Sequence, residues 1–592
     1  MTEQEWPVDF GEFDEASRES LRQIISRRRD VRRRFLPTPV PPDVLQRVLE
    51  AAHRAPSVGL TQPWDFMIVT DAARRREVAD HVEAERRRFA DSLPPARARR
   101  FSDQKIAAIE ETPMNLVVTS TLERGGAHIL GRYTQPEMAH YSTCLAIENL
   151  WLTARAEGLG VGWVSFYQPA VLSRILGLPA HAVPIAYLCI GYVDGFDTEP
   201  ELALRGWAKP RPLSWAIHHE TWEQRMTHPF DDAVRAVVAP DPAARDEVRQ
   251  HHLRLTKPAG SLGVLEKIGI ALAGMARQSP PPIPEPATVA VFAGDHGVVD
   301  SGVTPWPSEV TRQMVANFCG GGAAISAIAR QVGAEVIVVD IGVAGDLDAA
   351  PALLRRKVRP GTSNLEFGPA MTRAEALAAL DVGAEVAREL VATGARCLIT
   401  GDMGIGNTTA SAALIACFTG RPVGEVVGRG TGIDDPMLAR KTAVIETALR
   451  RTTSSAAAAA TATAADLDPL DVLASLGGLE IAGLAGFIVG GAAAGVPVLI
   501  DGVIAAAALI TAAALCPLAV EYCLAGHQSA EPGSRAVLEH LGLRPLLNLD
   551  LRLGEGTGAC LALPILQSAA RVLHEMATFD QAGVTHKDDT TP

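Results

Sequence analysis

The sequence lacks several features that would assign the chain to a specialised class of protein. Its eight cysteines form no CxxC pair and no His/Cys ladder at metal spacing, so we expect no metal site and free thiols in a reducing cytoplasm. The N-terminus, MTEQEWPVDFGEFDEAS, has no apolar core and therefore predicts no secretory signal. There is no excess of positive charge: the formal net charge of -13 argues against nucleic-acid and anionic-membrane partners.

Two charge-free runs, residues 481–500 and 503–520, could be mistaken for a membrane hairpin. Both are rich in Ala and Gly, no Lys or Arg flanks their junction, and Pro497 and Asp501 lie between them. We therefore favour a helix, a short buried strand over VPVLID and a second helix, as in the interior of a layered α/β domain. A membrane span is the alternative.

Length and composition predict more than one folded domain. The 592 residues exceed what a single core usually supports, and 47% hydrophobic with 21% charged residues is typical of globular chains. Ala and Gly become denser after about residue 235. We predict a first domain over 1–225, a linker over 226–245 and a second domain over 246–592.

Hydrophobic spacing gives a different fold class for each half. In the first half we predict helices over 15–26, 42–55 and 138–160 and strands over 66–70, 115–120 and 185–193, which make an α+β domain. In the second half we predict strands over 288–295, 334–343 and 395–404 alternating with helices over 310–332, 372–394 and from 408. That alternation implies a mostly parallel sheet with its site at the carboxyl ends of the strands.

An arginine-rich run marks a candidate site in the first half. SRRRDVRRRF, residues 26–35, places six arginines around one acid, and a Pro/Ser/Gly loop follows over 51–66. Guanidinium groups beside such a loop suit a bound phosphate, although most charge runs are solvated helix ends.

Four separated motifs, RRDVRRRF, AAHRAPSVGLTQPW, GVGWVSFY and KPRPL, resemble the 5,6-dimethylbenzimidazole synthases of the flavin nitroreductase superfamily over about residues 12–224. The resemblance implies an α+β nitroreductase-like fold, an intertwined homodimer and FMN at its interface. It also implies that FMN is held by Arg28, Arg29, Arg32, Ser57, Gln62 and Arg211.

In that family reduced FMN is the substrate, which O2 converts to the benzimidazole. The FMN would be reduced in place, or by NAD(P)H, or by a separate flavin reductase. Asp30 and Ser165 match the family's functional positions, Asp30 as a base or orienting acid beside arginines and Ser165 as a hydrogen-bonding hydroxyl. For Asp30 the alternative is an ordinary salt bridge. For the domain the alternatives are a flavin reductase or nitroreductase, or a non-catalytic flavin-binding scaffold.

Glycine-rich stretches mark the second half, at residues 293–298, 401–409, 428–435 and 553–559. None is a Walker loop, yet glycine permits close approach of a ligand to the backbone. GDMGIGNTT, 401–409, is the best phosphate candidate because it lies between a predicted strand and a predicted helix. LGEGTGA, 553–559, isolates one carboxylate, Glu555, among glycines.

Ten motifs in order resemble nicotinate-nucleotide:dimethylbenzimidazole phosphoribosyltransferase over about residues 246–585. They are TKPAGSLGVLE, AGDHGV, PWPSEVTRQMVANFCGGGAAI, GPAMT, GDMGIGNTT, GRGTGIDD, GGLEIAGLAG, HQSAEPG, LRLGEGTGA and MATF. The resemblance implies an α/β doubly wound large domain, a small helical domain made from both ends of the segment, and a homodimer.

That family transfers ribose phosphate from nicotinate mononucleotide to a benzimidazole with inversion, releasing nicotinate. The leaving group is already cationic, so one general base for the benzimidazole N–H suffices, and Glu555 matches the family's base. The alternative is that Glu555 caps the helix that begins after it. By the same matching, substrate is bound by Gly404, Ile405, Gly406, Asn407, Thr408, Gly430, Lys441, Trp306 and Met314.

Three positions depart from the family pattern: Asp402 stands in place of Glu, Ser534 in place of His and Ala259 in place of a second Pro. We expect His527 and the pair His218–His219 to make ordinary hydrogen bonds rather than bind metal.

Together the motifs predict one polypeptide, homo-oligomeric and without nucleic-acid or membrane partners, that makes dimethylbenzimidazole from FMN and converts it to α-ribazole 5'-phosphate. A different acceptor base, such as adenine or a phenol, is left open.

Overall fold

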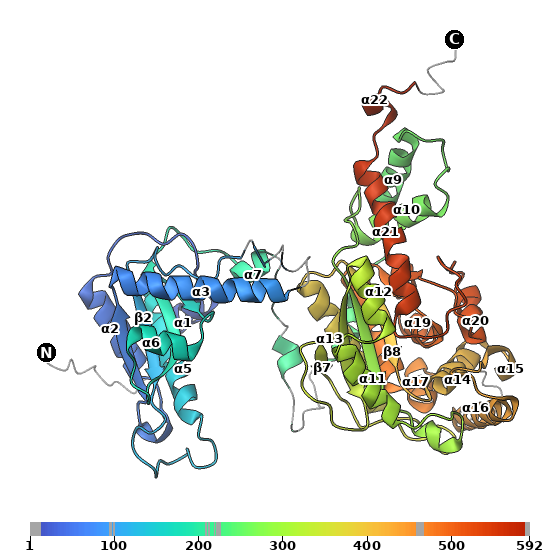
Figure 1. Cartoon of the computed structure of the whole chain (residues 1–592), viewed down its shortest axis with the longest axis horizontal. Helices are drawn as coiled ribbons and strands as arrows, with labels where there is room; N and C mark the ends of the chain where they lie inside the picture. The colour runs from blue at the N-terminus through green and yellow to red at the C-terminus, as the bar shows by residue number, and fades with distance from the viewer. Residues whose placement is uncertain are drawn as a thin grey trace. The chain divides into compact units, whose positions relative to one another are not determined.

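The computed structural model describes residues 13–456 and 467–585, apart from 94–97, 99–100, 103, 206, 208–209, 211–212, 218–219 and 221–226. The chain forms two compact units, Met1–Trp207 and Ala208–Pro592, and each is described by itself (Figure 1).

The first unit is built on a four-stranded antiparallel sheet of order β1-β2-β4-β3. Its strands are β1 Trp64–Val69, β2 Met114–Ser120, β3 Leu159–Val164 and β4 Val183–Tyr192. Its helices are α1 Glu15–Arg27, α2 Pro42–His53, α3 Ala72–Ser92, α5 Met138–Ala156, α6 Pro169–Leu176 and α7 Glu201–Leu204. The α+β prediction is confirmed.

Both faces of this sheet are covered by helices. Side chains of α2 and α5, such as Val48 and Leu150, pack on one face with Leu188. Val78 of α3 and Leu172 of α6 pack on the other face. These alternating contacts follow the two-residue period of the strands.

Two predicted helices differ from the structure. The helix predicted over 138–160 ends at Ala156, and Leu159–Val164 pairs with β4 as a strand. The helix predicted over 310–332 is two helices, α11 Glu309–Cys319 and α12 Ala324–Val332. Gly320, Gly321 and Gly322 separate them, with Gly321 at φ +74°, because glycine adopts conformations that interrupt a helix.

The second unit is built on a six-stranded, all-parallel sheet of order β10-β9-β8-β5-β6-β7. Its strands are β5 Ala287–Gly294, β6 Glu335–Gly342, β7 Leu353–Arg355, β8 Cys397–Met403, β9 Val498–Ile500 and β10 Cys523–Ala525. The strand order reverses between β5 and β8, so the doubly wound prediction is confirmed, and the crevice beyond their carboxyl ends is the expected binding position.

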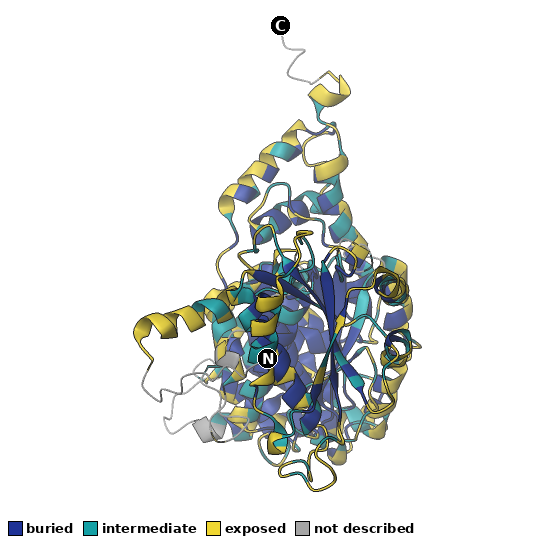
Figure 2. Cartoon of the chain, turned by 90° about the vertical axis from the view of Figure 1, so that its left-hand side faces the viewer, coloured by how far each residue is buried: buried dark blue, intermediate teal, exposed yellow. Residues whose placement is uncertain are grey.

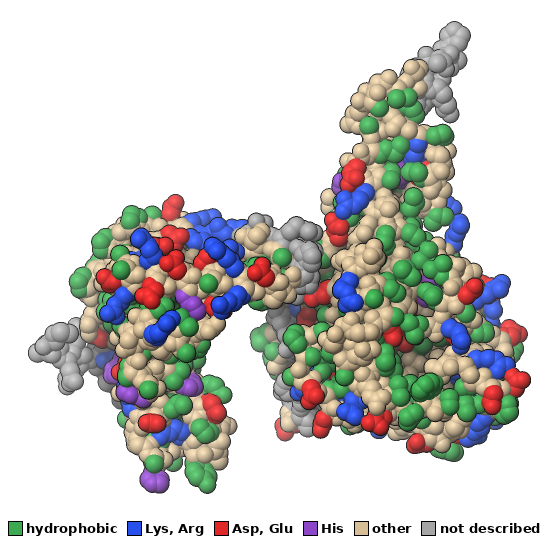
Figure 3. Space-filling model, in the orientation of Figure 1, with side chains coloured by type: hydrophobic (Ala, Val, Ile, Leu, Met, Phe, Trp, Pro, Cys, Tyr) green, Lys and Arg blue, Asp and Glu red, His purple; other side chains and the backbone are tan. Residues whose placement is uncertain are grey.

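The helices of the second unit surround this sheet. They are α8 Pro229–Ala236, α9 Pro242–Arg254, α10 Val264–Ala276, α11, α12, α13 Arg373–Ala392, α14 Asn407–Thr419, α15 Val423–Val426, α16 Asp435–Ala456, α17 Pro469–Leu476, α18 Leu479–Ala493, α19 Val503–Leu515, α20 Pro532–His540, α21 Thr557–Glu575 and α22 Phe579–Ala582. Figure 3 shows acidic, basic and apolar side chains interspersed over the visible face of this unit.

The charge-free runs form α18, β9 and α19, as predicted. Figure 2 colours buried residues dark blue, and every residue of α18 from Leu479 to Ala492 is buried. In the part of the chain that the structure describes, no helix has the length and hydropathy of a membrane span. These helices are apolar all round because they pack against neighbouring elements on several sides.

The small helical subdomain joins both ends of the unit. Helices α9 and α10 pack with the C-terminal half of α21, through Val248, Ala273 and Leu573 (Figure 1). The predicted linker contains α8, whose Phe230 is buried in the core of the second unit. The exact limits of the two domains stay a prediction.

Candidate functional sites

The carboxyl edge of the parallel sheet gathers the polar residues of the second unit. Asp295 and His296 follow β5, Asp402 lies near the end of β8, Asp501 follows β9 and His527 follows β10. All five are buried. Because parallel strands end at one edge, residues more than 200 positions apart in the sequence meet at this edge.

Glu555 enters this edge on a strained loop. It has φ +64°, a left-handed conformation that is uncommon outside glycine, and its side chain is buried. Its Oε2 accepts a hydrogen bond from the Ile325 amide at the start of α12, at 3.3 Å. Burial raises the pKa of Glu555, and the charge of Asp501 adds to that shift. A carboxylate with a raised pKa is suited to accept a proton near neutral pH.

Glu555 does not cap the helix that follows it. The N-cap of α21 is Gly556, and the amides of Gly556 and Ala559 donate to Asp501 at 3.1 and 2.9 Å. His527 contacts the same carboxylate at 3.1 Å. Asp501 therefore fixes the start of α21, and Glu555 is not needed as its cap. The sequence analysis did not predict this role of Asp501, although the position of Asp501 at the end of a predicted strand was a signal.

Asp402, one of the three departures from the family pattern, lies next to the loop that carries Glu555. A Cβ added to Gly554 would lie 3.2 Å from both carboxyl oxygens of Asp402, so this carboxyl group borders the loop backbone. Its Oδ2 accepts from Asn407 Nδ2 at 3.1 Å, and its buried Oδ1 has no hydrogen-bond partner. Burial, with the charges of Asp501 and Glu480, raises the pKa of Asp402 well above its ordinary value. Its protonated form is therefore favoured.

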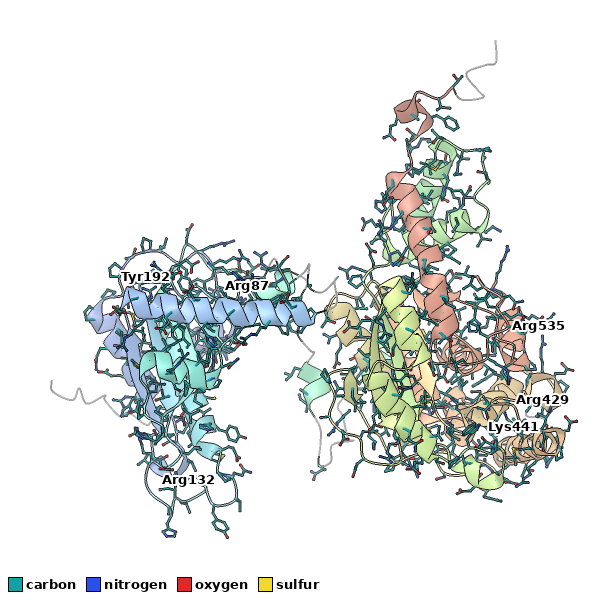
Figure 4. The ribbon with its side chains drawn as sticks, viewed as in Figure 1. Arg87, Arg132, Tyr192, Arg429, Lys441 and Arg535 are labelled. Atoms are coloured by element: carbon teal, nitrogen blue, oxygen red, sulfur yellow. The ribbon has the colours of Figure 1, made fainter. Side chains whose placement is uncertain are left out.

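Lys441, labelled in Figure 4, bonds to two of the predicted phosphate-binding segments, 401–409 and 428–435. From α16 it donates to Thr408 Oγ1 at 2.8 Å and to the Gly428 carbonyl at 3.1 Å. The Gly430 amide donates to Glu531 at 2.9 Å. Burial lowers the pKa of Lys441 to about 8, and the charge of Glu531 opposes that shift, so the ammonium persists at pH 7.

Two glycines of GDMGIGNTT, Gly404 and Gly406, are explained by the structure of the backbone around them. A Cβ on Gly404 would lie 2.3 Å from the Gly294 carbonyl, so this glycine permits contact with the end of β5. Gly406, at φ +93°, is the N-cap of α14. Asn407 and Thr408 then open the helix, which places helix-terminal amides beside Lys441, an arrangement that favours phosphate.

The two predicted base-pocket residues lie on and before α11. Trp306 is 49% exposed in the loop that precedes the helix. Met314 is partly buried, one turn after Thr311, whose hydroxyl accepts from the Ile405 amide at 3.1 Å. The Thr311–Ile405 hydrogen bond thus joins this helix to the predicted phosphate-binding segment.

Of the other polar positions, His296 has a buried carboxylate partner, whereas the buried hydroxyl of Ser534 has no hydrogen-bond partner. His296 Nε2 contacts Glu480 at 2.7 Å in a fully buried pair. Burial alone would lower the pKa of His296, but the Glu480 carboxylate raises it overall. Ser534 is buried and Ala259 exposed, with no further role assigned. Within the described ranges no cluster of His, Cys, Asp and Glu could hold a metal ion, and His218 and His219 lie outside those ranges.

In the first unit, glycines let the arginine-rich segment reach the sheet. A Cβ on Gly162 of β3 would lie 2.2 Å from the Val31 carbonyl, so only glycine permits this approach. Asp30 then accepts a hydrogen bond from the Trp163 amide at 3.0 Å and pairs with Arg32 at 2.6 Å. Asp30 is held in a fixed orientation by one amide and one guanidinium.

A cavity of about 320 Å³ adjoins this segment. Its charged lining comprises Arg29, Asp30, Arg32, Arg33, Arg34, Asp197, Glu199, Glu201 and Arg205. The lining carries five guanidinium groups against four carboxylates, and Arg32, Arg33 and Arg34 pair with Asp30, Glu201 and Asp197 respectively. Arg28 lies apart from this lining: its guanidinium is 4.8 Å from the Trp151 ring and 3.6 Å from Glu148, both on α5.

The other predicted flavin contacts lie on a second loop. The backbone amide of Gln62, a residue at φ +44°, donates a hydrogen bond to Ser57 Oγ at 2.9 Å. The backbone amide of Val58, next to Ser57, donates to Ser142 Oγ of α5 at 3.1 Å. The same helix thus touches both the Ser57 loop and Arg28. Ser165 is exposed directly after β3, and Arg211 lies outside the described residues.

Comparison with known proteins assigns the two units. Residues 237–584 match the DBI_PRT family, Phosphoribosyltransferase, and residues 25–192 match the Nitroreductase family. The nicotinate-nucleotide–dimethylbenzimidazole phosphoribosyltransferase of Salinispora tropica is 56% identical over 348 residues, which cover 56% of this chain and 93% of that protein. The enzyme of the same name from Chloroflexus aggregans is 53% identical over 349 residues, covering 59% and 96%.

Solved structures are also similar. The crystal structure of CobT from Thermus thermophilus aligns with 58% of this chain and 100% of its own, at 48% identity and a TM-score of 0.55. Oxidized iodotyrosine deiodinase bound to FMN and 3-iodo-L-tyrosine aligns with 34% of this chain and 100% of its own, at 21% identity and a TM-score of 0.28. Because its family match spans more than half of the sequence, the chain belongs to the phosphoribosyltransferase family and carries an N-terminal nitroreductase-family domain.

Proposed function

We propose that the second unit transfers ribose phosphate from nicotinate mononucleotide to 5,6-dimethylbenzimidazole, giving α-ribazole 5'-phosphate and nicotinate. The observation that carries this proposal is the strained, buried Glu555 at the strand-order reversal, where a ligand is expected. Asp402 borders the loop that carries Glu555 and accepts a hydrogen bond from Asn407. The next residue, Thr408, accepts a hydrogen bond from Lys441. The similarity to named transferases of this specificity supports the same assignment.

In this proposal Lys441, Thr408 and the first amides of α14 hold the nucleotide phosphate, with Gly430 against them. The acceptor nitrogen attacks the anomeric carbon from the face opposite nicotinate, the C–N bond to nicotinate breaks with its electron pair, and configuration inverts. Glu555 takes the proton from the second ring nitrogen of the acceptor. The raised pKa of Glu555 makes it a more effective base than an exposed glutamate at neutral pH.

The test is Glu555→Gln, assayed with both substrates supplied. Glutamine can accept the Ile325 hydrogen bond but cannot take a proton, so we expect kcat to fall by about 100-fold or more while KM for the nucleotide changes little. Glu539→Gln, an exposed carboxylate on α20, is the matched control and should keep full activity. If the kcat of Glu555→Gln lies within tenfold of the wild-type value, Glu555 is not the general base.

We propose further that the first unit converts reduced FMN and O2 to 5,6-dimethylbenzimidazole. Bound reduced FMN would supply the dimethylated ring. Arg29 and Arg32 would hold its phosphate end, Ser57 and Gln62 would lie near the ring, and Asp30 would accept or orient a proton. The Trp163 amide and Arg32 contacts support the Asp30 role because they hold its carboxyl group in a fixed orientation.

The corresponding test is Asp30→Asn. Asparagine can keep the Trp163 hydrogen bond but loses the charge, so we expect flavin binding to persist while dimethylbenzimidazole formation falls by about 100-fold. Flavin fluorescence measures the first quantity and mass-resolved product the second. Asp43→Asn, an exposed carboxylate on α2, is the control. Wild-type product formation by Asp30→Asn would favour the salt-bridge role alone.

A further inference from the structure

A second pocket in the C-terminal unit is distinct from the transferase site. It has a volume of about 770 Å³ and lies between the start of α13, the end of α16 and α17. Met371, Val472 and Ala474 form apolar walls. None of the residues assigned above to the phosphate or to Glu555 lines it, and its volume is in the range of small-molecule sites.

Two of the three arginines in this pocket already have carboxylate partners. Arg359 donates to both oxygens of Glu375 at 3.1 Å. Arg373 pairs with Asp468 at 2.8 Å and with Asp471 at 2.6 Å. Their charges are therefore balanced within the protein.

Arg451 is different. One of its terminal nitrogens donates to the Leu365 carbonyl at 3.0 Å, but its buried Nε has no hydrogen-bond partner. Among the described residues no carboxylate pairs with it. Burial lowers the pKa of Arg451, which shows that desolvation disfavours its charge. The Nε atom has no accessible surface, so an anion from outside the protein would bind through the terminal nitrogens of this guanidinium, which no carboxylate neutralises.

Hydroxyl groups beside Arg451 supply further polar contacts. Thr452, the next residue, shares a 2.6 Å hydrogen bond with Ser475 across the wall. Ser363 is exposed at the opposite wall, within 3.5 Å of Arg359. Ser363, Thr452 and Ser475 line the pocket together with the apolar side chains.

We propose that this pocket binds a small organic anion, with one phosphate or carboxylate on Arg451 and its apolar body against Met371, Val472 and Ala474. The apolar walls favour an organic body over a bare inorganic ion. Glu375, Asp468 and Asp471 pair with Arg359 and Arg373, so Arg451 is the guanidinium of the lining to which the described residues give no carboxylate.

The test is calorimetric titration of the full chain with phenyl phosphate, benzoate and inorganic phosphate. We expect phenyl phosphate or benzoate to bind, the tighter one identifying the anionic group, and inorganic phosphate to bind at least tenfold more weakly. Arg451→Gln should weaken the organic anion at least tenfold, while Arg450→Gln, an exposed neighbour, should not. Equal affinity for inorganic phosphate, or an unchanged titration in Arg451→Gln, would overturn the proposal.

A second pair of variants covers the case in which Arg451→Gln does not fold. Ser363→Glu adds a carboxylate at the exposed wall and should repel the probe, whereas Ser363→Gln adds similar bulk without charge. We expect at least a fivefold weaker affinity in Ser363→Glu than in Ser363→Gln. Equal affinities in this pair would contradict an anion at this position, and would assign any heat to the transferase phosphate site.

Discussion

At the scale of single residues, the most informative position is Glu555. A non-glycine residue at φ +64° that is also a buried carboxylate combines two unfavourable features, backbone strain and desolvation. Neither is explained by helix capping, because Asp501 accepts the amides at the start of α21. Such a combination is typical of active-site residues, and it supports the proposed role of Glu555 as the base.

The raised pKa of Glu555 gives a pH prediction. As a base it acts when ionised, so kcat/KM for transfer should fall as the pH drops through a value above the ordinary 4.5. Between those two values the folded state holds a proton that the unfolded state has lost, so the Glu555 contribution to stability should rise as the pH falls. Activity profiles and urea unfolding of wild type and Glu555→Gln measure both. An acidic limb at or below pH 4.5 would contradict the assignment.

The sequence predicted the residues that motifs carry, such as Glu555, Thr408 and Lys441, and the structure connects Thr408 to Lys441 directly. It did not predict their supports. Asp501 acts on Gly556, 55 positions away, and such long-range partners have no local spacing to detect. The Asp30–Trp163 contact spans 133 positions and also depends on the fold.

At the scale of secondary-structure elements, α13 and α18 pack at unusually close range through glycine. A Cβ on Gly383 would lie 1.9 Å from the Gly483 carbonyl, and one on Gly486 would lie 2.0 Å from the Leu380 carbonyl. Backbones this close leave no room for a methyl group. The Ala and Gly richness of the second half, which resembles a membrane signal in the sequence, is thus used for close helix packing.

This packing predicts opposite outcomes for two glycine-to-alanine changes. Alanine is favoured over glycine in a helix by about 1 kcal/mol, but overpacking costs about 1–3 kcal/mol or more. Gly383→Ala should therefore lower the free energy of unfolding by about 2 kcal/mol. Gly424→Ala, in α15 with open space around it, should leave it unchanged or raise it by up to about 1 kcal/mol. Urea unfolding compares them, and a fully stable Gly383→Ala would contradict the close contact.

Strands were the more predictable elements. The apolar runs over 115–120 and 185–193 correspond to β2 and β4. The strand β3 was missed because LGVGWV contains two glycines, which weaken the strand pattern; they are needed for the contact with the Asp30 segment. Local propensity and tertiary requirement therefore disagree at this position.

At the scale of the whole molecule, the chain joins a nitroreductase-family unit to a phosphoribosyltransferase unit. In the proposed function the product of the first unit is the acceptor of the second. A shared chain raises the effective concentration of one unit near the other, without requiring a channel. Family and fold class could be read from ordered motifs and from strand–helix alternation. Oligomeric assembly could not, because it depends on surfaces that no motif specifies.

The most direct test of this account is a one-pot assay of the purified chain with FMN, a reductant that recycles it, O2 and nicotinate mononucleotide, with products resolved by mass. We expect α-ribazole 5'-phosphate to form without added benzimidazole, and free dimethylbenzimidazole to accumulate in Glu555→Gln. If α-ribazole 5'-phosphate forms only when dimethylbenzimidazole is supplied, the first unit does not make the base, and its proposed role is contradicted.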